Sequence, residues 1–126
     1  MAQAVFNHQA KKLNIDAVAI SRGLCADESP VSENAVTALS EIGISGFEHT
    51  SATVTSDDIE KADYVIGITS RHTANLISAF PGYCDKIYSF PTDISDPYGG
   101  NIEVYRKTLS EIVDGVKSII DEVFPG

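Results

Sequence analysis

Three short apolar runs separated by helical patterns constrain the fold of this chain more than any other feature. The runs cover residues 16–21, 64–69 and 86–90, and each has the length of a buried strand. The second run, Tyr64-Val65-Ile66-Gly67-Ile68-Thr69, is apolar almost throughout, as strands covered on both faces tend to be. Because helical patterns lie between the runs, the sequence predicts an α/β fold: a three-layer parallel sheet flanked by helices.

Apolar spacing and capping residues predict five helices around these strands. They are expected over residues 2–13, 32–42, 55–62, 71–80 and 102–123. Ser32 is a candidate N-cap of the second helix, and Gly43 would end it. The last helix is the longest and carries an amphipathic stripe with steps of three and four: Ile102, Tyr105, Leu109, Ile112, Val116, Ile119 and Val123.

The first predicted helix starts at the beginning of the chain, with no strand or N-cap before it. Helices in α/β domains usually follow a strand, and their first N–H groups need partners. Three strands for five helices is also an uneven ratio. These two features predict that a strand preceding this helix is missing from the chain.

The acidic composition restricts the classes of partner. The chain has 18 acidic and 9 basic residues, a formal charge of −9, which disfavours nucleic acid and anionic lipid. Cys25 and Cys84 make no disulfide framework and, with three scattered histidines, show no metal-like spacing. No leader pattern or long apolar span is visible. We therefore expect a cytoplasmic protein with no metal and no cofactor, and with no nucleic-acid or membrane partner.

One segment follows the last predicted strand, where ligands gather in open α/β sheets. It reads Asp96-Pro97-Tyr98-Gly99-Gly100. Asp96 could act as a general acid, with Tyr98 walling the pocket. For the segment taken alone, a plain turn is the favoured alternative, because Asp-Pro and Gly-Gly are ordinary turn dipeptides. Ser21 also follows a strand, and its hydroxyl either supports a neighbouring loop or only ends the strand.

The two cysteines and His72 are interpreted as residues without a catalytic role. Cys25 lies in a loop without a neighbouring group that would stabilise a thiolate, and Cys84 follows a Pro-Gly turn. Both are interpreted as small structural residues rather than nucleophiles. His72 opens a helix and is interpreted as a surface or capping residue.

Four segments resemble the low-molecular-weight protein phosphatase family. In chain order they are "MAQAVF", "AISRGLCADESPVSENAVTALSEIGI", "HTSATVTSDDIEKADYVIGITSRH" and "SDPYGGNIEVYRKTLSEI". The first is similar to the helix after the family's phosphate-binding loop, and the last to its general-acid loop and final helix. The Gly-Gly and "IEVYRKT" version is most similar to the bacterial branch that includes protein arginine phosphatases. The resemblance covers nearly the whole chain and implies a single domain over residues 1–126.

The resemblance implies roles for three residues. Asp96 matches the aspartate that protonates the leaving group and then activates water. Tyr98 matches the aromatic residue that lines the substrate cleft. Ser21 matches a strand-end serine that hydrogen-bonds the phosphate loop. The implied function is hydrolysis of phosphotyrosine or phosphoarginine on a phosphorylated protein substrate, through a cysteinyl-phosphate intermediate. A non-catalytic binding or assembly module is the alternative, and the related arsenate reductases rank third.

The family's nucleophile and phosphate-binding arginine lie in a C-x-x-x-x-x-R-S-P loop, which no segment of this sequence matches. Neither Cys25 nor Cys84 stands at the nucleophile's position, and Arg22 does not match the arginine. The resemblance implies that this loop and the first central strand would come directly before the opening segment. We therefore expect the chain to be truncated relative to the family and inactive as a phosphatase.

The family's missing strand would lie between the strands over residues 17–20 and 64–68. Its absence leaves three expectations for the sheet. The two flanking strands pair directly, a second copy of the chain fills the gap in a homodimer, or the natural protein has more residues.

Overall fold

Helices form most of the structure, a computed structural model that describes residues 1–23, 33–45, 52–95, 97 and 99–124. The elements follow in the order α1 (Ala2–Lys12), α2 (Glu33–Glu41), α3 (Ser56–Lys61), β1 (Val65–Gly67), α4 (Ser70–Ala79), the 3₁₀ helix η1 (Pro81–Lys86), β2 (Ile87–Ser89) and α5 (Ile102–Val123). None of the described helices is both long and apolar enough to cross a bilayer.

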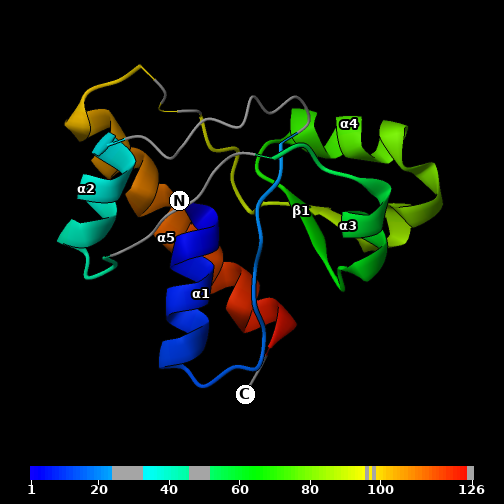
Figure 1. Ribbon diagram of the computed structural model, residues 1–126, viewed down its shortest axis with the longest axis horizontal. Coiled ribbons are helices and arrows are strands. Elements are labelled where there is room, and N and C mark those ends of the chain that lie inside the picture. The colour runs from blue at the N-terminus through cyan, green and yellow to red at the C-terminus, as the bar shows by residue number, and fades with distance from the viewer. Residues whose placement is uncertain (24–32, 46–51, 96, 98, 125–126) are drawn as a thin grey trace.

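Within the described residues the sheet consists of β1 and β2, which run parallel. Val65 lies opposite Ile87, and Gly67 lies opposite Ser89. The helices α1, α2 and α5 lie on one side of this sheet, while α3 and α4 lie on the other (Figure 1). The three-layer α/β arrangement predicted from the sequence is therefore confirmed.

The larger core lies between the sheet and α5. Of the α5 residues, Tyr105, Leu109, Ile112 and Val116 from the predicted stripe are buried in it, together with Ile120. From α1, Val5 is 1% exposed, and from α2, Leu39 is fully buried. A smaller cluster on the other side joins Ile59 of α3, Leu76 of α4 and Ile87 of β2.

Side-chain caps explain where several helices begin. Thr55 and Asp58 form a capping box at α3, in which each side chain accepts a hydrogen bond from the other residue's backbone N–H. Thr69 caps α4 by accepting from the N–H of His72, and Asn101 caps α5. His72 is exposed, as the surface interpretation expects, and its backbone N–H is capped by Thr69, so His72 is not itself the cap. The predicted cap Ser32 lies outside the described residues.

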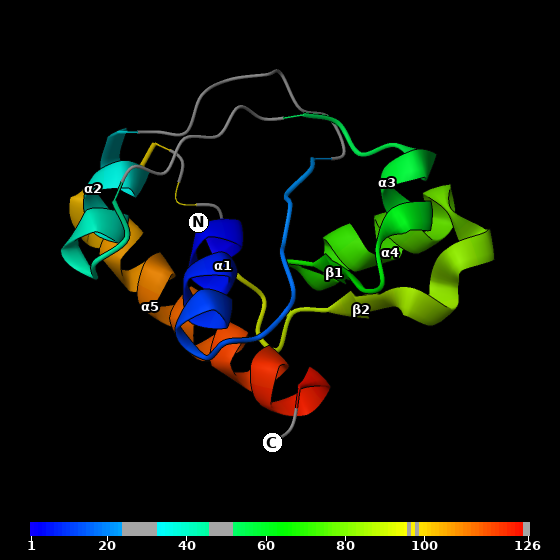
Figure 2. The same ribbon diagram turned by 60° about the horizontal axis from the view of Figure 1, so that its bottom comes forward.

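The predicted strand over residues 16–21 is wrong. Residues 16–20 are not in a strand and pair with no strand of the described residues, so the pairing with residues 64–68 that the sequence allowed is not formed. Figure 2 shows this segment passing between α1 and β1. The backbone of Ala19 instead pairs with a side chain, because Asn7 of α1 both donates to its carbonyl at 3.0 Å and accepts from its N–H at 2.7 Å. An isolated bridge joins Gly23 to Thr53.

Gly115 of α5 gives a test of the packing between the helix and the sheet. A Cβ built on Gly115 would lie 2.1 Å from Cε2 of Phe90. We expect Gly115→Ala to lower the free energy of unfolding by roughly 1–3 kcal/mol, because overpacking outweighs the gain of about 1 kcal/mol in helix propensity. Urea denaturation measures the change. Gly82→Ala is the matched control, since its Cβ would meet nothing within 4 Å. Equal stability of the two variants would contradict the packing.

The backbone amine of Met1 gives a test of pH dependence in the 126-residue chain. Burial lowers the pKa of this amine below its usual value of 8.0. Between the folded and unfolded pKa values the unfolded chain holds more protons, so the free energy of unfolding should rise as the pH increases towards about 8 and then level off. Urea denaturation at several pH values measures this. The N-acetylated chain should lack that component, and parallel pH profiles for the two chains would refute the expectation.

Candidate active site

The predicted general acid lies in the segment over residues 90–100, and the structure describes that segment except for residues 96 and 98. Asp96 and Tyr98 lie outside the described residues, as does Cys25, so the structure places none of these side chains. Pro97, Gly99 and Gly100 are described. The site is therefore built from the contacts that hold the neighbouring backbone.

On its amino side the segment is anchored to β1 and α4. The N–H of Phe90 donates to the carbonyl of Gly67 at 2.8 Å, and the N–H of Ile94 donates to that of Ile68 at 3.3 Å. Ile94 is 4% exposed and belongs to the larger core. These bonds hold residues 90–94 against the carboxyl end of β1.

Asp93 adds a second anchor at the start of α4. Its Oδ1 accepts from the N–H of Ser70 at 2.9 Å, and its Oδ2 accepts from the Ser70 hydroxyl at 3.0 Å. A carboxylate is favoured at a helix N-terminus because N–H groups without helical partners point towards it. Asp93 thus fixes the backbone three residues before Asp96.

On its carboxyl side the segment is attached to α2 and α5. The N–H of Gly100 donates to the carbonyl of Pro97 at 2.8 Å, and Nδ2 of Asn34 donates to the carbonyl of Gly100 at 3.3 Å. Gly99 has a φ of 82°, a left-handed conformation that glycine adopts without steric cost. The amino side of the segment therefore lies at the carboxyl end of β1, and its carboxyl side is held to α2.

Ser21 is positioned by α1. Its hydroxyl donates to Oε1 of Gln3 at 2.7 Å. The neighbouring Arg22 forms an ion pair with Asp58 of α3 at 3.3 Å, which ties the end of the extended segment to the opposite helical layer. Ser21 contacts the helix that would follow a phosphate loop, but its predicted bond to such a loop remains a prediction.

Cys84 precedes β2, whereas residues 90–100 follow it. Its side chain is exposed in η1. The strand therefore separates this thiol from the anchored segment. Across the part of the chain that the structure describes, no group of three His, Cys, Asp or Glu side chains could hold a metal ion.

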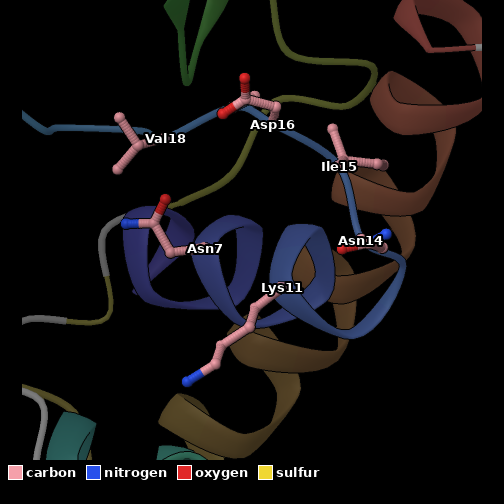
Figure 3. Close-up of a pocket in the computed structure, with 7 residues that line it drawn as sticks. Asn7, Lys11, Asn14, Ile15, Asp16 and Val18 are labelled. Carbon is pink, nitrogen blue, oxygen red and sulfur yellow. The ribbon is translucent and has the colours of Figure 1, made fainter.

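Two of the surface cavities among the described residues lie away from the anchored segment. The larger, of about 390 Å³, lies between α1 and residues 14–18, and Figure 3 shows Asn7 pointing to that segment while Lys11 extends away from it. The smaller, of about 240 Å³, lies between α2 and α5. Neither is lined by Ser21 or by residues 90–100.

Sequence reasoning missed Gln3, Asn7, Asn34 and Asp93. Gln3 and Asn7 stand four residues apart, a spacing that places them on one face of α1, so helical periodicity could have paired them with the extended segment. The partners of Asn34 and Asp93 are 66 and 23 residues away, and no local pattern indicates them.

Comparisons with known proteins agree with this arrangement. The sequence profile described as "Low molecular weight phosphotyrosine protein phosphatase" matches residues 1–124. A protein-arginine-phosphatase of Bacillus subtilis is 28% identical over 131 aligned positions, covering 98% of this chain and 87% of the relative. The low molecular weight protein-tyrosine-phosphatase PtpB of Staphylococcus haemolyticus is 32% identical, covering 82% of this chain and 78% of the relative.

The similarity extends to three dimensions. The crystal structure of a YwlE mutant from Bacillus subtilis superposes with a TM-score of 0.90 at 28% identity, covering 97% of this chain and 87% of that structure. The chain belongs to the low-molecular-weight phosphotyrosine protein phosphatase family.

Proposed function

We propose that residues 1–126 form one phosphatase-like domain, in which Asp96 is the general acid and base and Tyr98 lines the substrate cleft. Ser21 would support the phosphate-binding loop. The family acts on phosphorylated protein substrates, and its profile spans nearly the whole chain. That match is the observation that carries the proposal.

The anchors around residues 90–100 support the role of Asp96. A general acid must be held within hydrogen-bond reach of the leaving atom. Phe90, Asp93 and Ile94 fix the backbone on one side, and Asn34 fixes it through Gly100 on the other. The amino-side bonds hold the start of the segment at the carboxyl end of β1, and the substrate of an open α/β enzyme binds at this end of the sheet.

The 126-residue chain alone should be inactive. It contains no C-x-x-x-x-x-R segment, so no thiolate and no bidentate arginine are supplied together for a phosphoryl group. A general acid contributes on the order of 10²–10⁴-fold, whereas enzymes typically need accelerations of about 10⁶-fold or more. We therefore propose that this chain supplies the scaffold and the proton donor of the family's reaction, but not its nucleophile.

Phosphoarginine is the substrate that we favour. The matched relatives are named both as arginine and as tyrosine phosphatases, so similarity alone does not decide between them. The sequence "DPYGG" over residues 96–100 is similar to the arginine branch. A cytoplasmic location, expected from the sequence, belongs to the same proposal.

The second candidate function is a non-catalytic binding or assembly module. This candidate is favoured because neither cysteine stands where the family has its nucleophile. A homodimer that fills the gap in the sheet is part of this candidate, although a charge of −9 on each copy opposes association. Light scattering on the purified chain measures the oligomeric state directly.

The first prediction concerns activity of the chain as it stands. We expect no turnover of p-nitrophenyl phosphate above buffer, because the chain lacks a nucleophile with its anion cradle. The Cys25→Ser and Cys84→Ser variants should be indistinguishable from the parent chain. Release of p-nitrophenol measures all three. Robust turnover that survives both substitutions would show that the nucleophile assignment is wrong.

The second prediction concerns Asp96 in a form extended at its N-terminus by a strand and a C-x-x-x-x-x-R-S-P loop. In that form Asp96→Asn should lower kcat by about 10²–10³-fold for a leaving group that needs protonation. The loss should be smaller for p-nitrophenyl phosphate, whose leaving group is a better anion. Asp121→Asn, at an exposed position of α5, is the control. An unchanged kcat for Asp96→Asn would refute the general-acid assignment, and kcat/KM for phosphoarginine against phosphotyrosine tests the substrate.

A further inference from the structure

Asp93 and Ser70 form the side-chain contact that joins the segment before the proposed general acid to α4. The carboxylate of Asp93 accepts two hydrogen bonds from Ser70, one from the backbone N–H at 2.9 Å and one from the hydroxyl at 3.0 Å. Hydrogen bonds to an ionised acceptor are stronger than those between neutral groups, and a pair of them also fixes direction. Ser70 therefore holds the Asp93 side chain in one orientation.

The helix α4 does not depend on this contact for its start. Thr69 is its N-cap, and the Thr69 hydroxyl oxygen accepts from the N–H of His72 at 3.1 Å. The N–H of Ser70 belongs to the first turn, where N–H groups without helical partners can bond to water instead. Ser70 and Asp93 are both exposed, so water can replace either partner. The consequence of the contact therefore lies in the segment that carries Asp93.

In that segment the contact reinforces a long backbone bond. The N–H of Ile94 donates to the carbonyl of Ile68 at 3.3 Å, which is longer than the usual value of about 2.9–3.0 Å. Asp93 directly precedes Ile94 and adds two shorter bonds to α4. Ser95, the residue before Asp96, is exposed. Because consecutive Cα atoms stay about 3.8 Å apart, a shift at Asp93 passes along the chain to Asp96.

We propose that Asp93, held by Ser70, is a positioning residue that sets the place from which Asp96 delivers its proton. This role depends on the proposed function of Asp96 as general acid. With phenyl phosphate as the probe, the P–O bond breaks as the S–P bond of the cysteinyl-phosphate forms, and the Asp96 proton moves to the departing oxygen. A displacement of about 1 Å can cost about 10²-fold in such a step.

Ser70→Pro separates the contact from the helix. Ser70 is the first residue of α4, a position where proline is favoured because its fixed φ suits the helix and the lost N–H has no helical partner. Thr69 before it is extended, as the residue before a proline prefers. The substitution thus removes both donors to Asp93 and keeps α4. Asp93→Ala removes the acceptors instead, and Asp93→Asn keeps one acceptor for the N–H of Ser70.

The activity test uses the form extended at its N-terminus by a strand and a C-x-x-x-x-x-R-S-P loop. It compares kcat/KM for phenyl phosphate, whose leaving group needs a proton, with kcat/KM for p-nitrophenyl phosphate, whose leaving group is a better anion. Ser70→Pro and Asp93→Ala should each lower the first about tenfold and the second at most about twofold. Asp93→Asn should lie between Asp93→Ala and the parent. Asp121→Ala, at an exposed position of α5, is the matched control and should change neither.

A double-mutant cycle tests whether Asp93 acts through Asp96. When Asp96→Asn is present, adding Asp93→Ala should change kcat/KM for phenyl phosphate by less than about twofold, because a missing proton donor cannot be misplaced. Amide hydrogen exchange in the 126-residue chain gives a readout without catalysis. In Asp93→Ala the N–H of Ile94 should exchange about tenfold faster, while that of Leu109 in the core of α5 stays unchanged. If Ser70→Pro does not fold, the two Asp93 variants decide.

Equal losses for the two substrates would overturn the proposal, because a smaller share of folded protein lowers both by the same factor. Additive effects in the cycle would do so as well, since Asp93 would then act independently of Asp96. Full activity of Ser70→Pro and Asp93→Ala beside an impaired Asp96→Asn would refute the positioning role alone and leave the general acid standing. An unimpaired Asp96→Asn would refute both.

Discussion

The contact of Phe90 with Gly115 connects the sheet to its largest helix, and the other layers are arranged around it. Phe90 follows β2, and its N–H bonds to Gly67 of β1, so one residue joins both strands to α5. The helix can approach this closely only because Gly115 has no side chain. The same attachment starts the segment that carries Asp96. Core packing and the position of the candidate site thus depend on one close approach.

Backbone hydrogen bonding is the second constraint, and it is met in an unusual way along residues 16–20. An extended segment normally pairs with a neighbouring strand. Here the amide of Asn7 supplies one donor and one acceptor to Ala19, in the manner of a strand residue. A side chain can satisfy one residue on one edge only. Among the described residues no strand lies beside the opposite edge of this segment, so the region differs from an ordinary parallel sheet.

The sequence predicts the helices well because their signals are local. The apolar residues of α5 recur at steps of three and four, and the Thr55–Asp58 capping box joins residues three apart. The segment over residues 16–21 has an equally strong apolar pattern but forms no strand, since a strand also needs a partner that no local pattern supplies. The candidate site is harder still. The role of Asp96 comes from family resemblance, and the anchors Asp93 and Asn34 act through contacts distant in sequence.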